Sequence, residues 1–237
     1  MELERGIIIM KIAIAGAGAM GSRIGLMLHQ AGNEVILIDR WPDHIKAIRE
    51  NGLVGEFEDH EVVARLPIYS PEEIVGDHAN VDLVVALTKS MQLEAMFQDI
   101  QPIIGDQTFV FCLLNGLGHE ETLAKFVPKE NIIFGTTTWT AGLAGPGHAK
   151  LVGSGSIEME NLDPKGKAFT LKVLEVFQQA KLNPKQQCAL FHLEKGMYQW
   201  HTEWVMYDFR LQHCRIRRFD RNKRVVRIDR CGIFCSS

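Results

Sequence analysis

The strongest constraint on this chain is a glycine-rich turn close to its beginning. Lys11–Ala15 is a short apolar run, and apolar residues then recur at helical spacing over Ala19–Gln30. Between them lies a G-x-G-x-x-G pattern made by Gly16, Ala17, Gly18, Ala19, Met20 and Gly21. In such a strand, turn and helix, Gly16 permits the tight turn, Gly18 lets the backbone approach a pyrophosphate, and Gly21 lets the helix pack closely on the strand. The turn therefore predicts a dinucleotide site.

Apolar runs and helical patterns continue to alternate after this turn. Strands are expected at Glu34–Ile38, Val81–Leu87, Thr108–Leu114 and Ile132–Thr136. Helices are expected from Pro42 to Arg49, Met91 to Ile100, Glu120 to Phe126 and Lys165 to Ala180. This alternation predicts an α/β fold of the Rossmann type, a doubly wound parallel sheet with right-handed crossovers. The glycine-rich stretch from Gly142 to Gly155 predicts turns and short antiparallel strands.

Two adjacent charges at the end of the second expected strand bear on the choice of cofactor. Asp39 stands eighteen residues after Gly21, where a carboxylate can accept hydrogen bonds from the adenosine ribose of NAD. Arg40 follows it, and a guanidinium at this place can bind the 2′-phosphate of NADP. If Asp39 points toward the ribose, we expect NAD to be the cofactor. If Asp39 turns to solvent, Arg40 determines the choice of cofactor and favours NADP.

Composition excludes several other classes of protein. The 237 residues are 46% hydrophobic and 23% charged with a net charge of -3, so the whole chain has no basic excess of the kind that binds nucleic acid. No run of eighteen apolar residues occurs, which argues against a membrane span or a secretory signal and favours a cytoplasmic protein. The five cysteines form no CxxC pair and the nine histidines are scattered, so we expect no metal site.

Four segments carry a family resemblance. They are the run KIAIAGAGAMGS, then ALTKSMQ after the strand near Val81, then LLNGLGHEE after the next strand, then GTTTWTAGLAGPG. Their order and spacing over approximately Met10 to Pro184 resemble the amino-terminal domain of the ketopantoate reductases (2-dehydropantoate 2-reductases).

The resemblance implies NAD(P)H-dependent reduction of a small 2-oxo acid, that of 2-dehydropantoate in pantothenate biosynthesis, with NADP as cofactor and NAD as the alternative. It implies that the glycine loop holds the pyrophosphate, that Lys89 and Asn115 lie by the nicotinamide and the substrate, and that Ala141 contacts the cofactor. Intact members can form homodimers. Because NADP-using members carry a small residue where Asp39 stands, the chain also resembles the NAD-using branch, the D-2-hydroxyacid dehydrogenases of branched or aromatic 2-oxo acids.

One part of the family pattern is missing. Members carry a helical second domain that supplies the catalytic lysine as general acid, in a W-x-K-x-x-x-N-x-x-x-N motif. The present chain does not contain that motif, and neither Lys185 nor Lys195 lies in such a context. We therefore expect no intact catalytic residue.

The tail from Gln186 to Ser237 differs from the rest of the chain. It holds ten Lys and Arg against five Asp and Glu, and four of the five cysteines. Reading one nucleotide later with permitted codons, this segment can encode the missing motif, so we interpret residues 186–237 as an out-of-frame tail that replaces the helical domain. Residues 10–185 are then the dinucleotide-binding domain. Residues 1–9 are interpreted as a mis-annotated leader, because Glu4–Gly6 can be encoded by a bacterial ribosome-binding sequence just before Met10.

Three other functions are weighed against the enzyme. A catalytically dead dinucleotide-binding fragment is the main alternative. The presence or absence of a general acid distinguishes the active enzyme from this fragment. A redox sensor built on the tail cysteines requires a thiol of low pKa in a defined site. A nucleic-acid arm at Arg215–Arg230 is disfavoured, since such arms are poor in Cys, Ile and Phe.

Overall fold

The computed structural model describes residues 8–74, 81–116, 118–186, 218–219 and 225–226. The chain divides into two compact units, Met1–Leu190 and Phe191–Ser237. In the second unit the described residues form one antiparallel pair, β13 (Arg218–Phe219) with β14 (Val225–Val226). Among the described helices, none combines the length and the apolar character that crossing a bilayer requires.

The first unit is built on a large, mostly parallel sheet. In the described part of the chain this sheet has eight strands in the order β12-β11-β8-β7-β6-β1-β2-β5. All neighbours are parallel except β8 and β11. The strands are β1 (Lys11–Ala15), β2 (Glu34–Ile38), β5 (Ile68–Tyr69), β6 (Leu83–Ala86), β7 (Phe109–Cys112), β8 (Ile132–Thr137), β11 (Ile157–Asn161) and β12 (Pro184–Gln186).

The strand order places a topological switch point between β1 and β6. Starting from β1, the chain first adds β2 and β5 on one side and then β6, β7 and β8 on the other. The connections that leave β1 and β6 at their carboxyl ends therefore diverge, which leaves room at that edge for a ligand. The predicted doubly wound α/β sheet of Rossmann type is confirmed.

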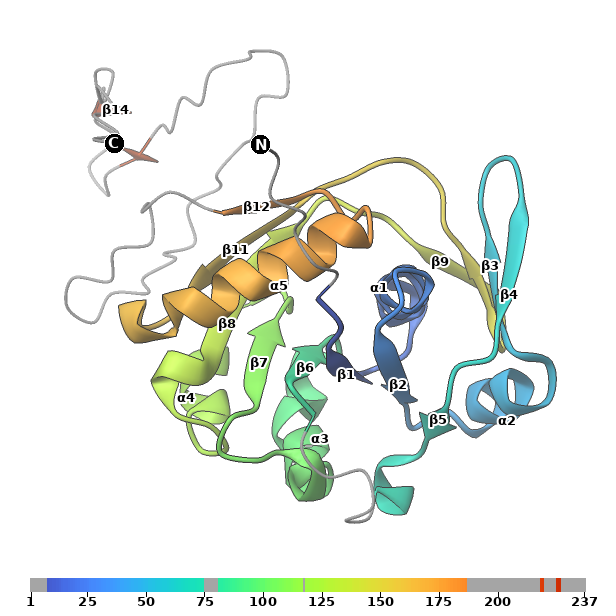
Figure 1. Cartoon of the computed structure of the whole chain (residues 1–237), viewed down its shortest axis with the longest axis horizontal. Coiled ribbons are helices and arrows are strands. Elements are labelled where there is room, and N and C mark those ends of the chain that lie inside the picture. Colours follow the sequence, from blue (N-terminus) through green and yellow to red (C-terminus); the bar gives the residue numbers. More distant parts are fainter. Residues whose placement is uncertain (1–7, 75–80, 117, 187–217, 220–224, 227–237) are drawn as a thin grey trace. The chain divides into compact units, whose positions relative to one another are not determined.

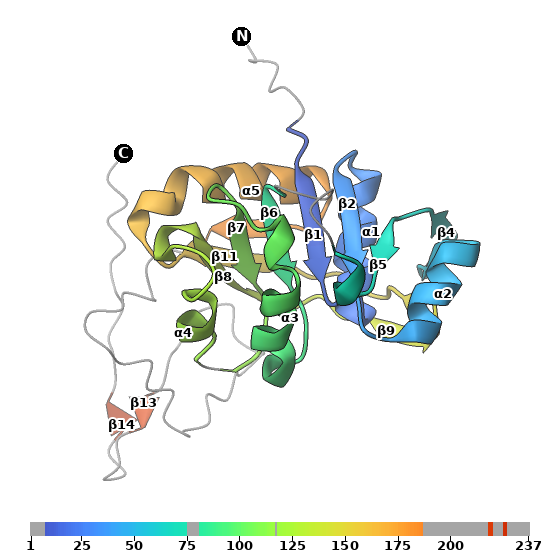
Figure 2. The ribbon, with the colours of Figure 1, turned by 90° about the horizontal axis from the view of Figure 1, so that it is seen from below.

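Helices cover both faces of this sheet, with α1 and α5 on one face and α3 and α4 on the other (Figures 1 and 2). Strand β1 shows why, since Ile12 and Ile14 pack with α1 and α5 while Ala13 and Ala15 pack with α3. The α-helices are α1 (Ala19–Gln30), α2 (Pro42–Asn51), α3 (Leu93–Asp99), α4 (His119–Leu123) and α5 (Lys167–Gln179). Short 3-10 turns are η1 (Pro71–Glu73), η3 (Ser90–Gln92), η4 (Gln101–Ile103), η5 (Lys129–Asn131) and η6 (Pro164–Gly166).

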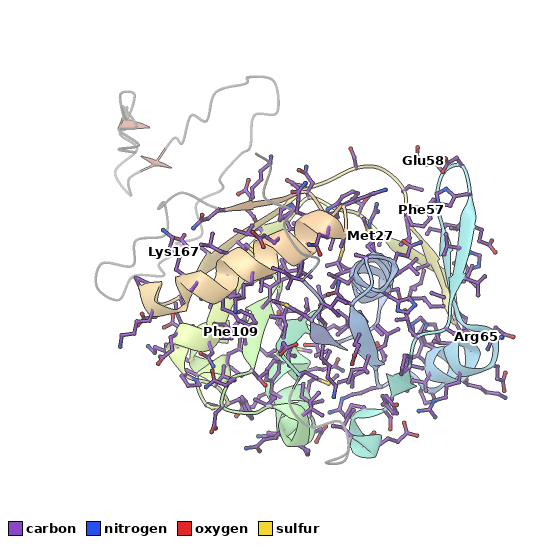
Figure 3. The ribbon with its side chains drawn as sticks, in the orientation of Figure 1. Met27, Phe57, Glu58, Arg65, Phe109 and Lys167 are labelled. Carbon is purple, nitrogen blue, oxygen red and sulfur yellow. The ribbon has the colours of Figure 1, made fainter. Side chains whose placement is uncertain are left out.

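Aromatic packing fixes α5 on the sheet. The ring of Phe109 on β7 stacks on Phe169 of α5 with centroids 3.8 Å apart, and Phe111 meets Phe177 edge to face at 5.5 Å. Figure 3 shows Phe109 directly below this helix. Such aromatic pairs add to the stability gained from burying the rings.

A smaller sheet lies beside α1 and α2, with the strand order β4-β3-β10-β9. The antiparallel pair β9–β10 confirms the turns and short strands expected between Gly142 and Gly155. The β3–β4 hairpin, whose turn carries Glu58 (Figure 3), and its parallel pairing with β10 were not expected. The strands of the smaller sheet are β3 (Leu53–Glu56), β4 (Glu61–Ala64), β9 (Gly142–Gly145) and β10 (His148–Lys150).

Candidate functional site

The glycine loop joins the end of β1 to the start of α1 at the switch point. The backbone N–H groups of Gly16 and Ala17 both donate to the carbonyl of Ile38 at the end of β2, at 2.9 and 3.2 Å. Gly16 has φ +102°, a conformation that residues with a Cβ rarely adopt. The loop is therefore held against the carboxyl end of the neighbouring strand before any ligand arrives.

The three glycines of the pattern differ in what the fold demands at each position. A Cβ on Gly16 would come within 2.7–2.8 Å of the Leu87–Thr88 backbone after β6, and a Cβ on Gly21 would lie 1.9 Å from the Gly16 carbonyl oxygen. Gly18 has an ordinary φ of -60°, and a Cβ there would meet no atom within 4 Å. Nothing inside the chain demands a glycine at Gly18, so the open space beside it fits an external group such as a pyrophosphate.

The carbonyl of Ala17 is held by two side chains. Ser22 Oγ donates to it at 2.8 Å and His44 Nε2 donates at 2.9 Å. The peptide group that joins Ala17 to Gly18 is trans, because the described chain contains no cis bond, so its Gly18 N–H points opposite to its Ala17 carbonyl. Together with the amino end of α1, whose first N–H groups and dipole favour negative charge, this arrangement suits a phosphate.

His44 itself is fully buried between the glycine loop and the β9–β10 turn. The Gly147 N–H donates to His44 Nδ1 at 2.9 Å, so Nδ1 must carry a lone pair and Nε2 the proton. The ring of Trp41 stacks on the imidazole with centroids 5.4 Å apart. Burial lowers the pKa of His44, while the charge of Asp39 and the bond to Ala17 raise it by less.

The ends of β6 and β7 reach the same edge of the sheet. Lys89 and Asn115 are both exposed, and Ser90 Oγ donates to the Asn115 carbonyl at 2.9 Å, which ties the two loops together. His119 Nε2 lies 3.1 Å from the same carbonyl. Gly16 lies against Leu87 and Thr88, so the glycine loop adjoins the loop that carries Lys89.

Asp39 and Arg40 follow β2 at this edge but differ in their bonding. One Asp39 carboxylate oxygen, Oδ1, accepts the Trp41 N–H at 2.9 Å. The Arg40 guanidinium pairs closely with Asp99 at the end of α3 and more loosely with Glu72 at 3.4 Å. Arg40 is thus held by acidic side chains of neighbouring elements.

Ala141 lies in the connection between β8 and β9, and Arg23 of α1 fixes this segment. The buried Arg23 guanidinium donates to the carbonyls of Thr140, Val152 and Gly153 at 2.5, 2.9 and 3.1 Å. It also stacks over the Trp139 ring at 4.1 Å, and Trp139 Nε1 donates to the Leu182 carbonyl at 2.8 Å. The side chains of Trp139 and Met20 are partly buried and pack against the core.

The structure brings the glycine loop, Asp39 and Lys89 together with Asn115 at one edge, with Ala141 beside α1. Sequence reasoning missed the supporting residues His44, Arg23 and Ser90. The i, i+1, i+4 spacing of His44, Ile45 and Ile48 could have shown that His44 faces inward, but its carbonyl partner could not be found that way.

Cys112 lies at the same edge of the sheet, at the end of β7. The Cys112 thiol at the end of β7 is buried, and burial raises its pKa to about 11, far from a reactive thiolate. Within the described ranges, no group of three or more His, Cys, Asp and Glu side chains is arranged to hold a metal ion.

Comparisons with known proteins agree with this architecture. A family model described as ketopantoate reductase PanE/ApbA matches residues 12–164. A 2-dehydropantoate 2-reductase of Lactococcus lactis subsp. lactis (strain IL1403) is 52% identical over 176 residues, which are 74% of this chain and 56% of that protein. One from Pyrococcus abyssi (strain GE5 / Orsay) is 34% identical over 193 residues, 81% of this chain and 58% of that protein. The chain therefore spans little more than half the length of these relatives.

Solved structures show the same relationship. A protein from Enterococcus faecalis, provisionally named 2-dehydropantoate 2-reductase, superposes with a TM-score of 0.75 at 64% identity, covering 76% of this chain and 58% of that one. A D-mandelate dehydrogenase determined with NADH and anilino(oxo)acetate gives a TM-score of 0.73 at 54% identity, covering 76% and 57%. The present chain belongs to the ketopantoate reductase PanE/ApbA family.

Proposed function

We propose that this chain binds NAD(P)H along the carboxyl edge of its sheet and serves the reduction of a 2-oxo acid. The observation that carries the proposal is Gly18, whose freedom from steric demands inside the chain leaves an external pyrophosphate as the reason for a glycine. The Gly18 N–H and the amino end of α1 would hold the pyrophosphate, and Asp39 would accept from the adenosine ribose.

We infer that NADH is preferred over NADPH. The Arg40 guanidinium, which a 2′-phosphate would need, is already paired with Asp99 and Glu72. A phosphate placed beside Asp39 would meet a carboxylate, and two unit charges 4 Å apart interact by about 4 kcal/mol at an effective dielectric constant of 20. The NADH in the D-mandelate dehydrogenase structure is consistent with this choice.

The bound nicotinamide would supply the hydride that reduces the carbonyl carbon of the 2-oxo acid. The Lys89 ammonium would attract the substrate carboxylate, and the Asn115 amide would bind the substrate or the carboxamide of the cofactor. Protonation of the developing alkoxide needs a general acid, and we assign that role to no described residue.

We propose 2-dehydropantoate as the substrate, because the curated relatives at 47–52% identity carry that name. A branched or aromatic 2-oxo acid is the second candidate. The 54% identity to a D-mandelate dehydrogenase and the carboxylate of Asp39 favour it.

We further infer that residues 10–185 form the dinucleotide-binding domain and that the segment 186–237 is read out of frame. Most of that segment lies outside the described residues. If the inference is right, the chain as written binds the cofactor but turns over little substrate.

The direct test is titration of the full chain with NADH and NADPH, followed by the protection that each gives against thermal unfolding. We expect NADH to bind and to raise the melting temperature, since a ligand that binds only the folded state stabilises it. A full chain that is folded but binds neither nucleotide would contradict the proposal.

A further inference from the structure

The starting observation is that His44 connects two segments far apart in the sequence. Its Nε2–H donates to Ala17 in the glycine loop, and its Nδ1 accepts from Gly147 in the β9–β10 turn. The imidazole is completely buried, so both bonds are sheltered from water. The loss of either bond would therefore leave buried polar groups without a hydrogen-bond partner.

The approach of the turn to α2 is close enough to make this connection rigid. Gly147 has φ +72°, and a Cβ there would lie 2.9 Å from the Ala47 Cβ, so its backbone packs directly on the helix that carries His44. The Trp41 ring stacks on the imidazole with an interplanar angle of 6°, which restricts the plane of the imidazole. The ring therefore has one orientation and one tautomer, because Gly147 can only donate.

We propose that His44 is a positioning residue for the cofactor: as the neutral Nε2–H tautomer it fixes the Ala17 carbonyl and thereby aims the Gly18 N–H at the pyrophosphate. The inference rests on the proposed function, since it concerns the same loop. Protonation of the ring puts a second N–H at Nδ1, facing the Gly147 N–H, so the protonated form must break the connection. Cofactor affinity is thus coupled to the β9–β10 turn and to pH.

Other charged groups on the adjoining elements set the background for this titration. They are Asp39 at the end of β2, Asp43 on α2 itself, and an ion pair at 3.1 Å between His148 of β10 and Glu56 of β3. His148 directly follows Gly147 in the chain. Because these groups surround the imidazole, the effect of His44 must be isolated by comparing variants rather than from one pH profile.

Two substitutions separate the two hydrogen bonds. In His44→Asn the amide oxygen takes the place of Nδ1 and can still accept from Gly147, but the donor to Ala17 is lost. In His44→Gln the amide NH₂ reaches the place of Nε2 and can still donate to Ala17. If His44 only supported the fold, the two variants would bind the nucleotide with the same affinity.

Asn33 offers a matched control. It is also buried, and it also joins two backbone groups, accepting from the Met10 N–H and donating to the Leu28 carbonyl, both at 3.0 Å. Met10 precedes β1, so Asn33 lies at the opposite, amino edge of the sheet. Asn33→Ala should reduce stability while leaving nucleotide affinity unchanged.

The experiment measures the dissociation constant of NAD⁺, which is stable in acid, for the full chain and the three variants between about pH 5.5 and 8. We expect His44→Asn to weaken binding about five- to tenfold, the loss of one of two donors to Ala17. His44→Gln should stay within about twofold of wild type. Wild-type affinity should fall toward pH 5.5 more steeply than that of His44→Gln.

The outcomes distinguish the two proposals. Wild-type chain that binds neither NAD⁺ nor NADH overturns the proposed function and this inference with it. Wild-type binding that is matched by His44→Asn, or lost equally in both His44 variants, overturns the role of His44 alone. If His44→Asn does not fold, equal pH profiles of wild type and His44→Gln still overturn it.

Discussion

The two halves of the carboxyl edge are built in different ways. In the half formed by the glycine loop, backbone atoms are fixed by Ile38, Ser22 and His44, and the candidate ligand-binding groups are the backbone itself. In the half formed by the ends of β6 and β7, the backbone is tied by Ser90, but the side chains of Lys89 and Asn115 are exposed. The first half is organised by contacts among β1, α1, β2 and α2, whereas the second half presents exposed side chains at the ends of two strands.

The largest effect should come from completing the second half. Restoring the shifted reading frame after Lys185 should raise turnover of ketopantoate or of a branched 2-oxo acid by about a hundred- to ten-thousandfold, the usual value of general acid catalysis. Steady-state rates of the two proteins, with NADH and with NADPH, measure this. Sequencing the gene through the codons for Asn183 to Ala189 is the companion observation, and comparable rates from both proteins would contradict the frameshift.

The next effect should break the first half without disturbing the fold. Gly18→Val should lower NADH affinity by about a hundredfold, because the side chain fills the pyrophosphate space and removes several charge-assisted hydrogen bonds. Its melting temperature should stay near wild type, since a Cβ there meets no protein atom. Fluorescence titration and thermal unfolding give the two values.

Gly21→Val is the control for this prediction. Its Cβ would overlap the Gly16 carbonyl oxygen at 1.9 Å, so the protein should be strongly destabilised whether or not nucleotide is present. If Gly18→Val kept wild-type affinity, the assignment of the glycine loop to the pyrophosphate would be wrong.

The contrast between the two halves also explains what the sequence could predict. The sheet and the places of the glycine loop, Asp39, Lys89 and Asn115 follow from local spacing, because each of these sites lies at the end of an apolar strand. The hairpin β3–β4 was missed because its parallel partner β10 lies far along the chain and its strands are short and mixed in polarity.

The supporting bonds were missed for a related reason. His44 and Arg23 bind carbonyl oxygens of distant residues, and every residue has a carbonyl, so no side-chain pattern marks the partner. The pairing of Arg40 with Asp99 likewise depends on how α3 packs on its face of the sheet, which no local spacing reveals.

Cofactor preference should respond in two steps. Asp39→Ala should raise the ratio of NADPH to NADH affinity by up to about tenfold, since it removes a carboxylate that would repel the 2′-phosphate at a partly exposed site. Adding Asp99→Ala should raise the ratio further, because Arg40 is then free to turn toward the phosphate. Dissociation constants for both nucleotides measure the ratio.

Glu72→Ala provides the comparison for the second step. The Glu72 pair with Arg40 is longer, at 3.4 Å, and its side chain is 68% exposed, so its removal should change the ratio less than Asp99→Ala does. An unchanged ratio in Asp39→Ala would mean that the carboxylate faces solvent and takes no part in the choice.

The smallest effect should be the pH dependence of stability that His44 confers. Its pKa in the folded protein is lowered below the ordinary value of 6.5 by burial, so below that pH the unfolded chain binds more protons than the folded chain. The contribution of the neutral imidazole is therefore complete above pH 6.5 and is lost as the pH falls from 6.5 toward the folded pKa. Each unit by which the pKa is lowered corresponds to about 1.4 kcal/mol.

Urea unfolding of wild type and His44→Gln at pH 7.5 and 5.5 isolates this contribution. Glu73 and Asp59, whose pKa values are lowered by hydrogen bonds to Arg49 and His60, lose their contribution in a more acidic range, so they do not confuse the comparison. We expect wild type to lose about 1 kcal/mol more than His44→Gln between the two pH values. Equal losses of stability would mean that the imidazole is not held neutral in the folded protein. The glycine loop would then be held by its bonds to Ser22 and Ile38, without a contribution from neutral His44.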